Sequence, residues 1–308
     1  MGRVGGENEI GMAAGAAVRS VDHRWSGAVA VFYIFLWASA YVPSKIASTG
    51  SPPLWFLAAR FGTAGFVLAL LALAWRRPFP STKRAWLVAI TLGILGNALY
   101  LGLTYTALAH HLSSGLGAIV ASTNPLVLAI VAPRALGEPL DARKALGLAC
   151  GFGGVLAIVL ARAGTGTAAP HDVLLAFGGV CASVASTVLF KRAALGQDLL
   201  ALSAVQMLAA GVVIVPVAWL TTGMPHAALT GALGASFAYL VVVLSVGATV
   251  IWFWLLGRGE ASRVSAFYYL TPVFGLALSA LLLHERVEPH DMIGLAAIAA
   301  GILLVQRG

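Results

Sequence analysis

Long apolar runs separated by short polar or turn-forming segments make up most of this chain. Residues 1–25 are small and polar and lack the apolar core of a secretory signal, so we expect a cytoplasmic tail there. Runs of roughly 20 apolar residues are typical of helices that cross a bilayer and satisfy their own backbone hydrogen bonds. Ten such runs follow the tail, at about 26–47, 53–75, 85–108, 113–133, 144–162, 171–190, 199–220, 231–256, 262–283 and 290–306. The pattern predicts an all-α membrane protein with ten transmembrane helices.

A stretch from Thr123 to Val159 recurs near the C-terminus. Each copy is an apolar run, a short loop with a glutamate and a second apolar run with glycines. A shift of 147 positions (272 − 125) places Pro125 on Pro272, Glu138 on Glu285, Gly147 on Gly294, Leu148 on Leu295 and Gly154 on Gly301. Several matches at one offset indicate an internal repeat. We predict that one helical hairpin is used twice.

Composition supports the membrane interpretation. The chain is 60% hydrophobic and 10% charged, and its mean hydropathy is +0.92. Globular domains carry about 25% charged residues. A bilayer is therefore the expected surrounding of the chain.

The basic residues predict the orientation, because Lys and Arg accumulate in loops that stay in the cytoplasm. With the N-terminus inside, the outer ends hold only Lys45, Arg162 and Arg286, and Arg60 lies within a run. The inner segments hold fifteen of the nineteen, namely Arg3, Arg19, Arg24, Arg76, Arg77, Lys83, Arg84, Arg134, Arg143, Lys144, Lys191, Arg192, Arg258, Arg263 and Arg307. This bias places both termini in the cytoplasm. It also accounts for the net charge of +8 without a nucleic-acid partner.

Ten helices form two units of five, and an odd unit re-enters the membrane in the opposite direction. The loop around Glu138 is rich in basic residues and is expected inside, whereas the loop around Glu285 is expected outside. Inverted-topology repeats occur in many secondary transporters, which bind substrate near the midplane between the halves. We predict a 5+5 inverted repeat around a central cavity.

These residues resemble the drug/metabolite transporter (DMT) superfamily, and within it the ten-helix exporters with two EamA repeats. The resemblance rests on Trp37-Ala38-Ser39-Ala40-Tyr41 with Lys45, on Pro53 and Arg60, and on both proline–glutamate–glycine hairpins. It implies EamA repeats at 26–162 (helices 1–5) and 171–306 (helices 6–10), and a cavity lined by helices 1, 3, 4, 6, 8 and 9, with helices 5 and 10 to one side. It further implies export of amino acids or related small amphipathic metabolites across a bacterial-type inner membrane. YddG-type aromatic amino acid exporters are the first relatives to consider.

Polar and aromatic residues in the middle of the runs are candidates for the substrate site. An uncompensated amide in hydrocarbon costs roughly 2 kcal/mol or more, so Asn97 and Asn124 must face a cavity or bond to another helix. Hydroxyls are weaker signals, since Ser and Thr readily bond the carbonyl one turn back. The predicted substrate-binding residues are Trp37, Tyr41, Asn97, Tyr100, Asn124, Ser186, Ser245, Trp252, Tyr268 and Thr271.

Two prolines and two cations complete the candidate set. Pro125 and Pro272 form a repeat-related pair that interrupts helices 4 and 9, and we interpret them as hinges, with static kinks as the alternative. Lys45 and Arg60 are candidates to hold a substrate carboxylate, although Lys45 can snorkel to the interface and Arg60 can bond another helix.

All eleven acidic residues lie in the tail or near helix ends, so no midplane carboxylate is expected as a proton relay. His110 and His111 are the titratable alternatives near neutral pH, with polar caps as the plainer interpretation. Glu138 and Glu285 are interpreted as capping or loop-bonding residues. The sequence predicts no cofactor and no metal.

Several functions stay open at this level. The leading hypothesis is a secondary exporter, which is not an enzyme, and a nucleotide-sugar or drug-type carrier of the same fold is the alternative. A membrane enzyme finds no support in His284-Glu285-Arg286-Val287-Glu288, which is not an HExxH motif. A channel lacks a visible ring of charge or filter-like loop. Small-residue faces around Gly147, Gly151, Ala297 and Gly301 indicate close helix packing, within the chain or across a homodimer.

Overall fold

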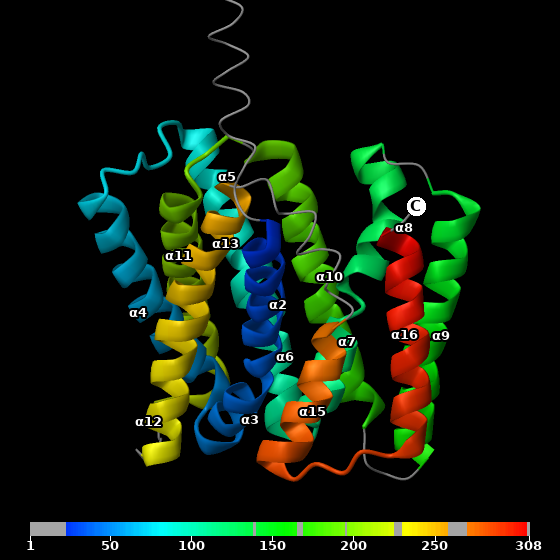
Figure 1. Ribbon diagram of the computed structural model, residues 1–308. Helices are drawn as coiled ribbons and strands as arrows, with labels where there is room; N and C mark the ends of the chain where they lie inside the picture. Colours follow the sequence, from blue (N-terminus) through cyan, green and yellow to red (C-terminus); the bar gives the residue numbers. More distant parts are fainter. Residues whose placement is uncertain are drawn as a thin grey trace, which may run out of the picture.

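The computed structural model describes residues 23–137, 140–164, 169–194, 196–224, 230–257 and 270–306. All regular structure within these ranges is helical (Figure 1). The first half contains α2 (His23–Ser39), α3 (Tyr41–Gly50), α4 (Pro53–Ala74), α5 (Lys83–Gly93), η1 (Ile94–Leu99), α6 (Tyr100–His110), α7 (Ser114–Ala121), α8 (Asn124–Leu136) and α9 (Ala142–Gly164). The second half contains α10 (Pro170–Ala193), α11 (Leu199–Thr222), α12 (Gly231–Ala238), η2 (Tyr239–Gly247), α13 (Ala248–Gly257), α15 (Thr271–Leu283) and α16 (Pro289–Gln306).

Eight helical segments of the described residues are long and apolar enough to cross a membrane. Two shorter apolar helices, Thr271–Leu283 and Pro289–Leu304, follow them. The all-helical membrane class is therefore confirmed. The count of ten spans stays a prediction, as do the roles of residues 1–22 and Glu138, which lie outside the described residues.

Local sequence explains where several helices begin. Thr82, Ser113 and Thr230 each accept a hydrogen bond from the backbone N–H three residues later, and Asp198 accepts two from Leu200 and Ala201. Pro53 and Pro170 occupy first positions, where a missing N–H leaves no bond unmade. The short connections seen in the sequence thus act as helix-start signals.

The long helices are irregular at matching places. The third and eighth predicted runs each contain a π-helical segment, η1 and η2, and a shift of 147 carries 94–99 onto 241–246, inside 239–247. The fourth run breaks at Ser122 and Thr123, and Pro125 then lies in the first turn of α8. The predicted interruption is present, but it lies before the proline. A proline in the first turn of a helix removes no backbone hydrogen bond, so Pro125 is accommodated at the start of α8. Pro272 has the same place in α15.

Two helix pairs have the most extensive contacts, α4 with α11 and α9 with α16. A Cβ on Gly154 would lie 2.6 Å from Gly294 O, and one on Gly301 would lie 2.5 Å from Gly147 O. The later glycine of α9 thus contacts the earlier glycine of α16, and the earlier glycine of α9 contacts the later one of α16. The two helices therefore run antiparallel. The glycine faces therefore pack against each other within one chain, which confirms the predicted packing role, and a homodimer stays a prediction.

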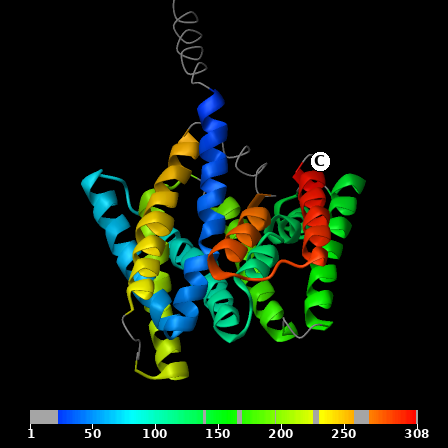
Figure 2. The ribbon, with the colours of Figure 1, turned by 60° about the horizontal axis from the view of Figure 1, so that its bottom comes forward.

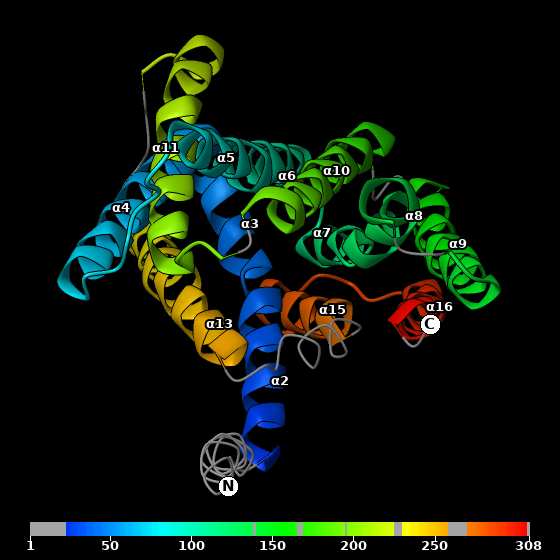
Figure 3. The same ribbon diagram turned by 90° about the horizontal axis from the view of Figure 1, so that it is seen from above.

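Viewed from above, α8, α9 and α16 lie to one side of the group formed by α2, α4, α11 and α13 (Figure 3). This agrees with the position that the resemblance implies for helices 5 and 10. The start of α2 and the end of α16 lie at the same end of the bundle (Figures 1 and 2).

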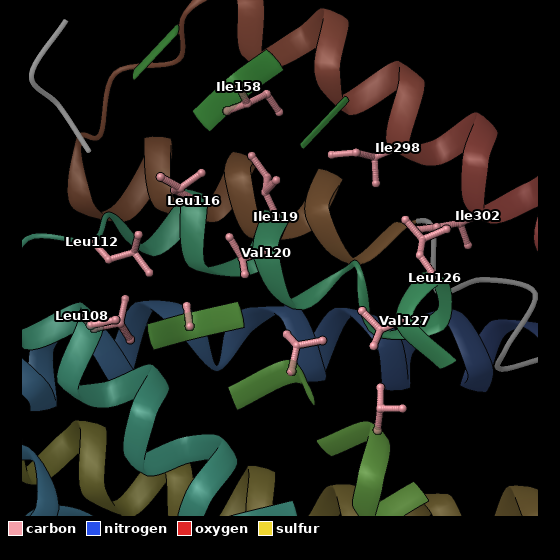
Figure 4. Packing of buried hydrophobic residues seen from close by; sticks show 14 residues of the cluster. Leu108, Leu112, Leu116, Ile119, Val120, Leu126, Val127, Ile158, Ile298 and Ile302 are labelled. Carbon is pink, nitrogen blue, oxygen red and sulfur yellow. The ribbon is translucent and has the colours of Figure 1, made fainter. Parts of the chain in front are cut away.

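Between these two groups lies the largest buried apolar cluster, which centres on α7 (Figure 4). Leu116, Ile119 and Val120 of α7 meet Ile158 of α9 and Ile298 of α16, all less than 2% exposed. This cluster fills the space beside α7 with packed side chains.

Candidate functional site

A cavity lies among α2, α3, α4, α6, α11, α13 and the two π-helical segments. It holds about 860 Å³ of empty space, including the part that continues to solvent. The lining residues are Tyr33, Trp37, Ala40, Tyr41, Ser44, Arg60, Phe61, Asn97, Tyr100, Leu101, Thr104, Tyr105, Leu108, Ser203, Met207, Leu244, Ser245, Ala248, Thr249 and Trp252.

Arg60 is the one cation among these lining residues, and it is 7% exposed. Its Nε donates to Ser245 Oγ and its Nη1 to Tyr105 OH, both at 3.2 Å. Tyr105 OH is in turn 2.9 Å from Ser44 Oγ. No carboxylate of the described residues pairs with Arg60, and no acidic residue is among the described lining. A buried guanidinium with only neutral partners makes the cavity attractive to an anion.

Aromatic rings line another part of the cavity. Tyr33 stacks on Trp252 with centroids 5.5 Å apart and lies 6.4 Å from Trp37. Tyr41 OH and Tyr100 OH are 3.5 Å apart. These side chains offer flat apolar faces with polar edges, which suit a ring or an alkyl chain carrying a polar group.

Equivalent positions of the two repeats face this cavity with different chemistry. At the offset of 147, Arg60 corresponds to Met207, Asn97 to Leu244 and Tyr105 to Trp252, and all six line the cavity. The first half thus contributes a cation, an amide and a phenol where the second contributes a thioether, an aliphatic chain and an indole. At these three pairs of positions the first half is therefore the more polar contributor.

Seven of the predicted site residues meet here: Trp37, Tyr41, Arg60, Asn97, Tyr100, Ser245 and Trp252. The π-helical segments explain the placement of Asn97 and Ser245, because a π-helical turn shifts the side chains that follow relative to a regular helix. Arg60 also donates hydrogen bonds to other helices, which is the alternative role expected for it.

Four predicted residues lie outside this lining, and each is used in packing or bonding. Asn124 Nδ2 donates to Ser183 Oγ of α10 at 2.9 Å, which is the interhelical alternative for this amide. Ser186 Oγ donates to Leu92 O at 3.3 Å. Thr271 is buried at the start of α15, and Lys45 Nζ donates to the carbonyls of Leu108 and Leu112 at 2.6 and 2.7 Å. Tyr268 lies outside the described residues.

The helices that line the cavity also differ from the implied set. Described residues of the second and seventh runs line it, whereas those of the fourth, sixth and ninth do not. The reason for α10 is close packing: a Cβ on Gly179 would lie 2.7 Å from Tyr100 O of α6. Its face toward α6 is therefore filled by backbone and leaves no open space.

Sequence reasoning missed several lining residues, including Tyr33, Ser44, Tyr105, Met207 and Leu244. Two signals identify them in retrospect. Tyr33, Trp37, Tyr41 and Ser44 repeat at helical spacing along one face. The offset of 147 transfers Arg60 to Met207 and Asn97 to Leu244.

Glu285 confirms its expected capping role. Its carboxylate oxygens accept hydrogen bonds from the backbone N–H groups of Ser114 at 2.7 Å and Gly115 at 3.0 Å, at the start of α7. A carboxylate at this position satisfies two free donors and complements the helix dipole. It is not part of the cavity.

Comparison with known proteins gives the family. The model of the EamA-like transporter family matches residues 25–160 and again residues 172–307. We refer to these two regions as the first and second repeat.

Individual relatives are similar over nearly their whole length. The uncharacterized transporter YvbV of Bacillus subtilis is 28% identical over 89% of each chain. The uncharacterized inner membrane transporter YedA of Escherichia coli K12 is 28% identical over 92% of this chain and 90% of its own. Protein PecM of Dickeya dadantii is 26% identical over 88% and 89%. A solved crystal structure superposes with a TM-score of 0.63 over 92% of this chain and 98% of the other, at 19% identity, which shows the fold alone.

Proposed function

The chain belongs to the EamA-like transporter family, and from this premise we propose that it is a secondary transporter that exports amino acids or related small amphipathic carboxylates across the inner membrane by alternating access. The observation that carries the substrate class is Arg60, a buried cation in the cavity whose hydrogen-bond partners among the described residues are hydroxyl groups.

The arrangement of the lining supports an amphipathic substrate. Arg60 supplies donors for a carboxylate, and Asn97 offers both a donor and an acceptor to a neighbouring polar group. Met207, Leu244 and Trp252 of the second repeat supply an apolar surface for a side chain. A nucleotide sugar carries a diphosphate, and one cation among the described lining residues matches a single carboxylate better.

Symmetry-related contacts support an inverted repeat. Gly147 corresponds to Gly294 and Gly154 to Gly301, so the contact of Gly154 with Gly294 and that of Gly301 with Gly147 are one contact made twice. A two-fold axis between antiparallel helices generates such a pair, as expected for two five-helix units of opposite orientation. Alternating access then consists of exchanging two nearly equivalent arrangements of the repeats.

Transport assays on purified protein in liposomes test the function. We expect saturable uptake of labelled phenylalanine or leucine that is accelerated by unlabelled substrate inside the vesicle. Phenethylamine, which lacks the carboxylate, should compete poorly if Arg60 binds that group. Unsaturable flux would indicate a channel, and no flux with any amino acid or aromatic carboxylate would contradict the proposal.

The orientation has its own test in a matched pair of exposed positions. Leu140 and Val287 are equivalent at the offset of 147 and are 46% and 41% exposed. In a background with Cys150 and Cys181 replaced by alanine, we expect Leu140→Cys to react with an impermeant maleimide only from the cytoplasm. Val287→Cys should react only from outside. Labelling of both from one side would contradict the inverted repeat.

A further inference from the structure

Two histidines and one aspartate meet where α6 ends and α10 begins. His110 Nδ1 and His171 Nε2 each lie 3.0 Å from the same oxygen, Asp172 Oδ1. One potential ligand atom from each of the three residues lies within 4.8 Å of the others. His110 belongs to the first repeat and Asp172 to the second, and His171 directly precedes the second repeat.

Burial separates the carboxylate from the two imidazoles. The Asp172 side chain has no exposed surface, and its Oδ2 has no hydrogen-bond partner among the described residues. The side chains of His110 and His171 are 49% and 67% exposed. A buried carboxylate oxygen without a donor is costly, so the cluster as it stands leaves bonding capacity unused.

The start of α16 shows how the same tripeptide is neutralised elsewhere. Pro-His-Asp begins both α10 and α16. Asp291 accepts two hydrogen bonds from Arg162, at 2.9 Å from Nε and 2.7 Å from Nη2. Asp172 has no Arg or Lys of the described residues within ion-pair distance. Lys45 interacts electrostatically with Asp172, but its Nζ donates its hydrogen bonds to two backbone carbonyls.

We propose that His110, His171 and Asp172 form a binding site for a zinc-class divalent metal ion that joins α6 to α10. Zinc takes nitrogen ligands at about 2.0–2.1 Å and carboxylate oxygens at about 2.0–2.2 Å in tetrahedral geometry. Tetrahedral ligands at those lengths are about 3.4 Å apart, so the two 3.0 Å pairs need to separate by a few tenths of an ångström, and the two imidazole nitrogens, which lie within 4.8 Å of each other, need to take the same spacing. The exposure of both imidazoles leaves the fourth position to water.

The ligand set selects the metal. Imidazole nitrogens favour Zn²⁺, Ni²⁺ and Cu²⁺, whereas Mg²⁺ and Ca²⁺ prefer sites made of oxygens. The sequence alone gives no sign of this cluster, because 62 positions separate His110 from Asp172. Only the packing of α10 on α6 brings them together.

Titration of tag-free protein with Zn²⁺ in a calorimeter tests the site. We expect one zinc per chain, and we expect the dissociation constant of a His110→Ala/His171→Ala double variant to rise by more than about tenfold. A His111→Ala/His290→Ala double variant is the matched control, since both variants retain five of seven histidines. Both positions changed at the site are half-exposed or more, so folding should be preserved.

Co²⁺ reports the coordination directly. We expect the absorption of four-coordinate Co²⁺ with the wild type and the control variant, and its loss with the site variant; Mg²⁺ should produce no heat of binding. Equal zinc affinity of the site variant and the wild type would overturn the proposal, as would the absence of zinc binding by the wild type.

The effect on transport rests on the proposed function, and the binding experiments do not. A metal that fixes α6 to α10 holds the two repeats together at one end. Zinc should therefore slow amino acid counterflow by the wild type and the control variant but not by the site variant. Absence of transport in every condition would contradict the proposed function, and the calorimetry would still decide whether the metal site exists.

Discussion

The two repeats share their backbone features but not their cavity chemistry. Each has a π-helical segment at the same position, and each ends its repeated helix on a left-handed residue, Gly137 or His284. The equivalent lining positions differ, with Arg60 opposite Met207 and Asn97 opposite Leu244. The elements that set helix shape and crossing are thus shared, whereas the side chains that the two repeats place in the cavity differ at these positions.

The α2 helix shows the same asymmetry. Its Tyr33 and Trp37 face the cavity, whereas its counterpart α10 turns its glycines to α6 and lines no part of the cavity among the described residues. An approximate two-fold therefore relates the helices but not the binding surface, which is suitable for a substrate that has no symmetry itself.

Replacing Arg60 with methionine, the residue at the equivalent position of the second repeat, should have the largest effect on transport. Arg60→Met removes the cation from the cavity, and loss of a charge-assisted contact of about 3 kcal/mol lowers kcat/KM for carboxylate substrates by about 100-fold. Counterflow in liposomes measures it, with Met207→Leu as the volume-conserving control at the equivalent position of the second repeat. Unchanged transport by Arg60→Met would show that the cation does not contact substrate.

A large side chain at the glycines where α9 and α16 cross should have the second-largest effect. A Cβ on Gly154 meets Gly294 O, whereas nothing lies within 4 Å of a Cβ on Gly153. We expect Gly154→Leu to lower stability by about 2 kcal/mol through overpacking, seen as a lower melting temperature in detergent. Gly301→Leu, its repeat equivalent, should cost a similar amount and Gly153→Leu almost nothing. A loss confined to one of the two equivalent glycines would break the symmetry argument.

Trp252→Ala should reduce the transport of ring-bearing substrates more than that of other substrates. Removing a stacked indole from a partly buried site costs about 1.4 kcal/mol for a ring-bearing substrate, or about tenfold in kcat/KM. Leucine transport should fall less than phenylalanine transport, because the ring loses its aromatic partner. Equal losses for both substrates would assign Trp252 to packing alone.

The smallest expected effect concerns the two left-handed helix ends. Gly137 (φ 71°) donates its N–H to Ala132 O, and His284 (φ 54°) donates to Ser279 O at the equivalent position. A side chain at positive φ is strained, so His284→Gly should raise stability by about 1 kcal/mol, while Gly137→His should lower it by a similar amount. Thermal melting of both variants checks the opposite signs; changes of the same sign would contradict the shared geometry.

Much of the fold could be predicted because membrane helices are long and uniform. The apolar runs located every described helical segment, and the 147-residue offset matched α8 with α15 and α9 with α16. Parts of the site were predictable for a related reason: Asn97, Arg60 and Trp37 are costly or unusual inside a bilayer. Asn124 shows the limit, since an amide in hydrocarbon needs a partner and Ser183 on α10 meets that need as well as a cavity would.

The sequence by itself determined the membrane class, the repeat and the family, because each depends on local hydropathy and on matches along the chain. Tertiary structure decided which polar residues share the cavity and which bond to a neighbouring helix, since that depends on helix rotation and on crossings such as Gly154 on Gly294. It also decided that His110, His171 and Asp172 meet. Residues so far apart in the chain become one site only through the packing of α10 against α6.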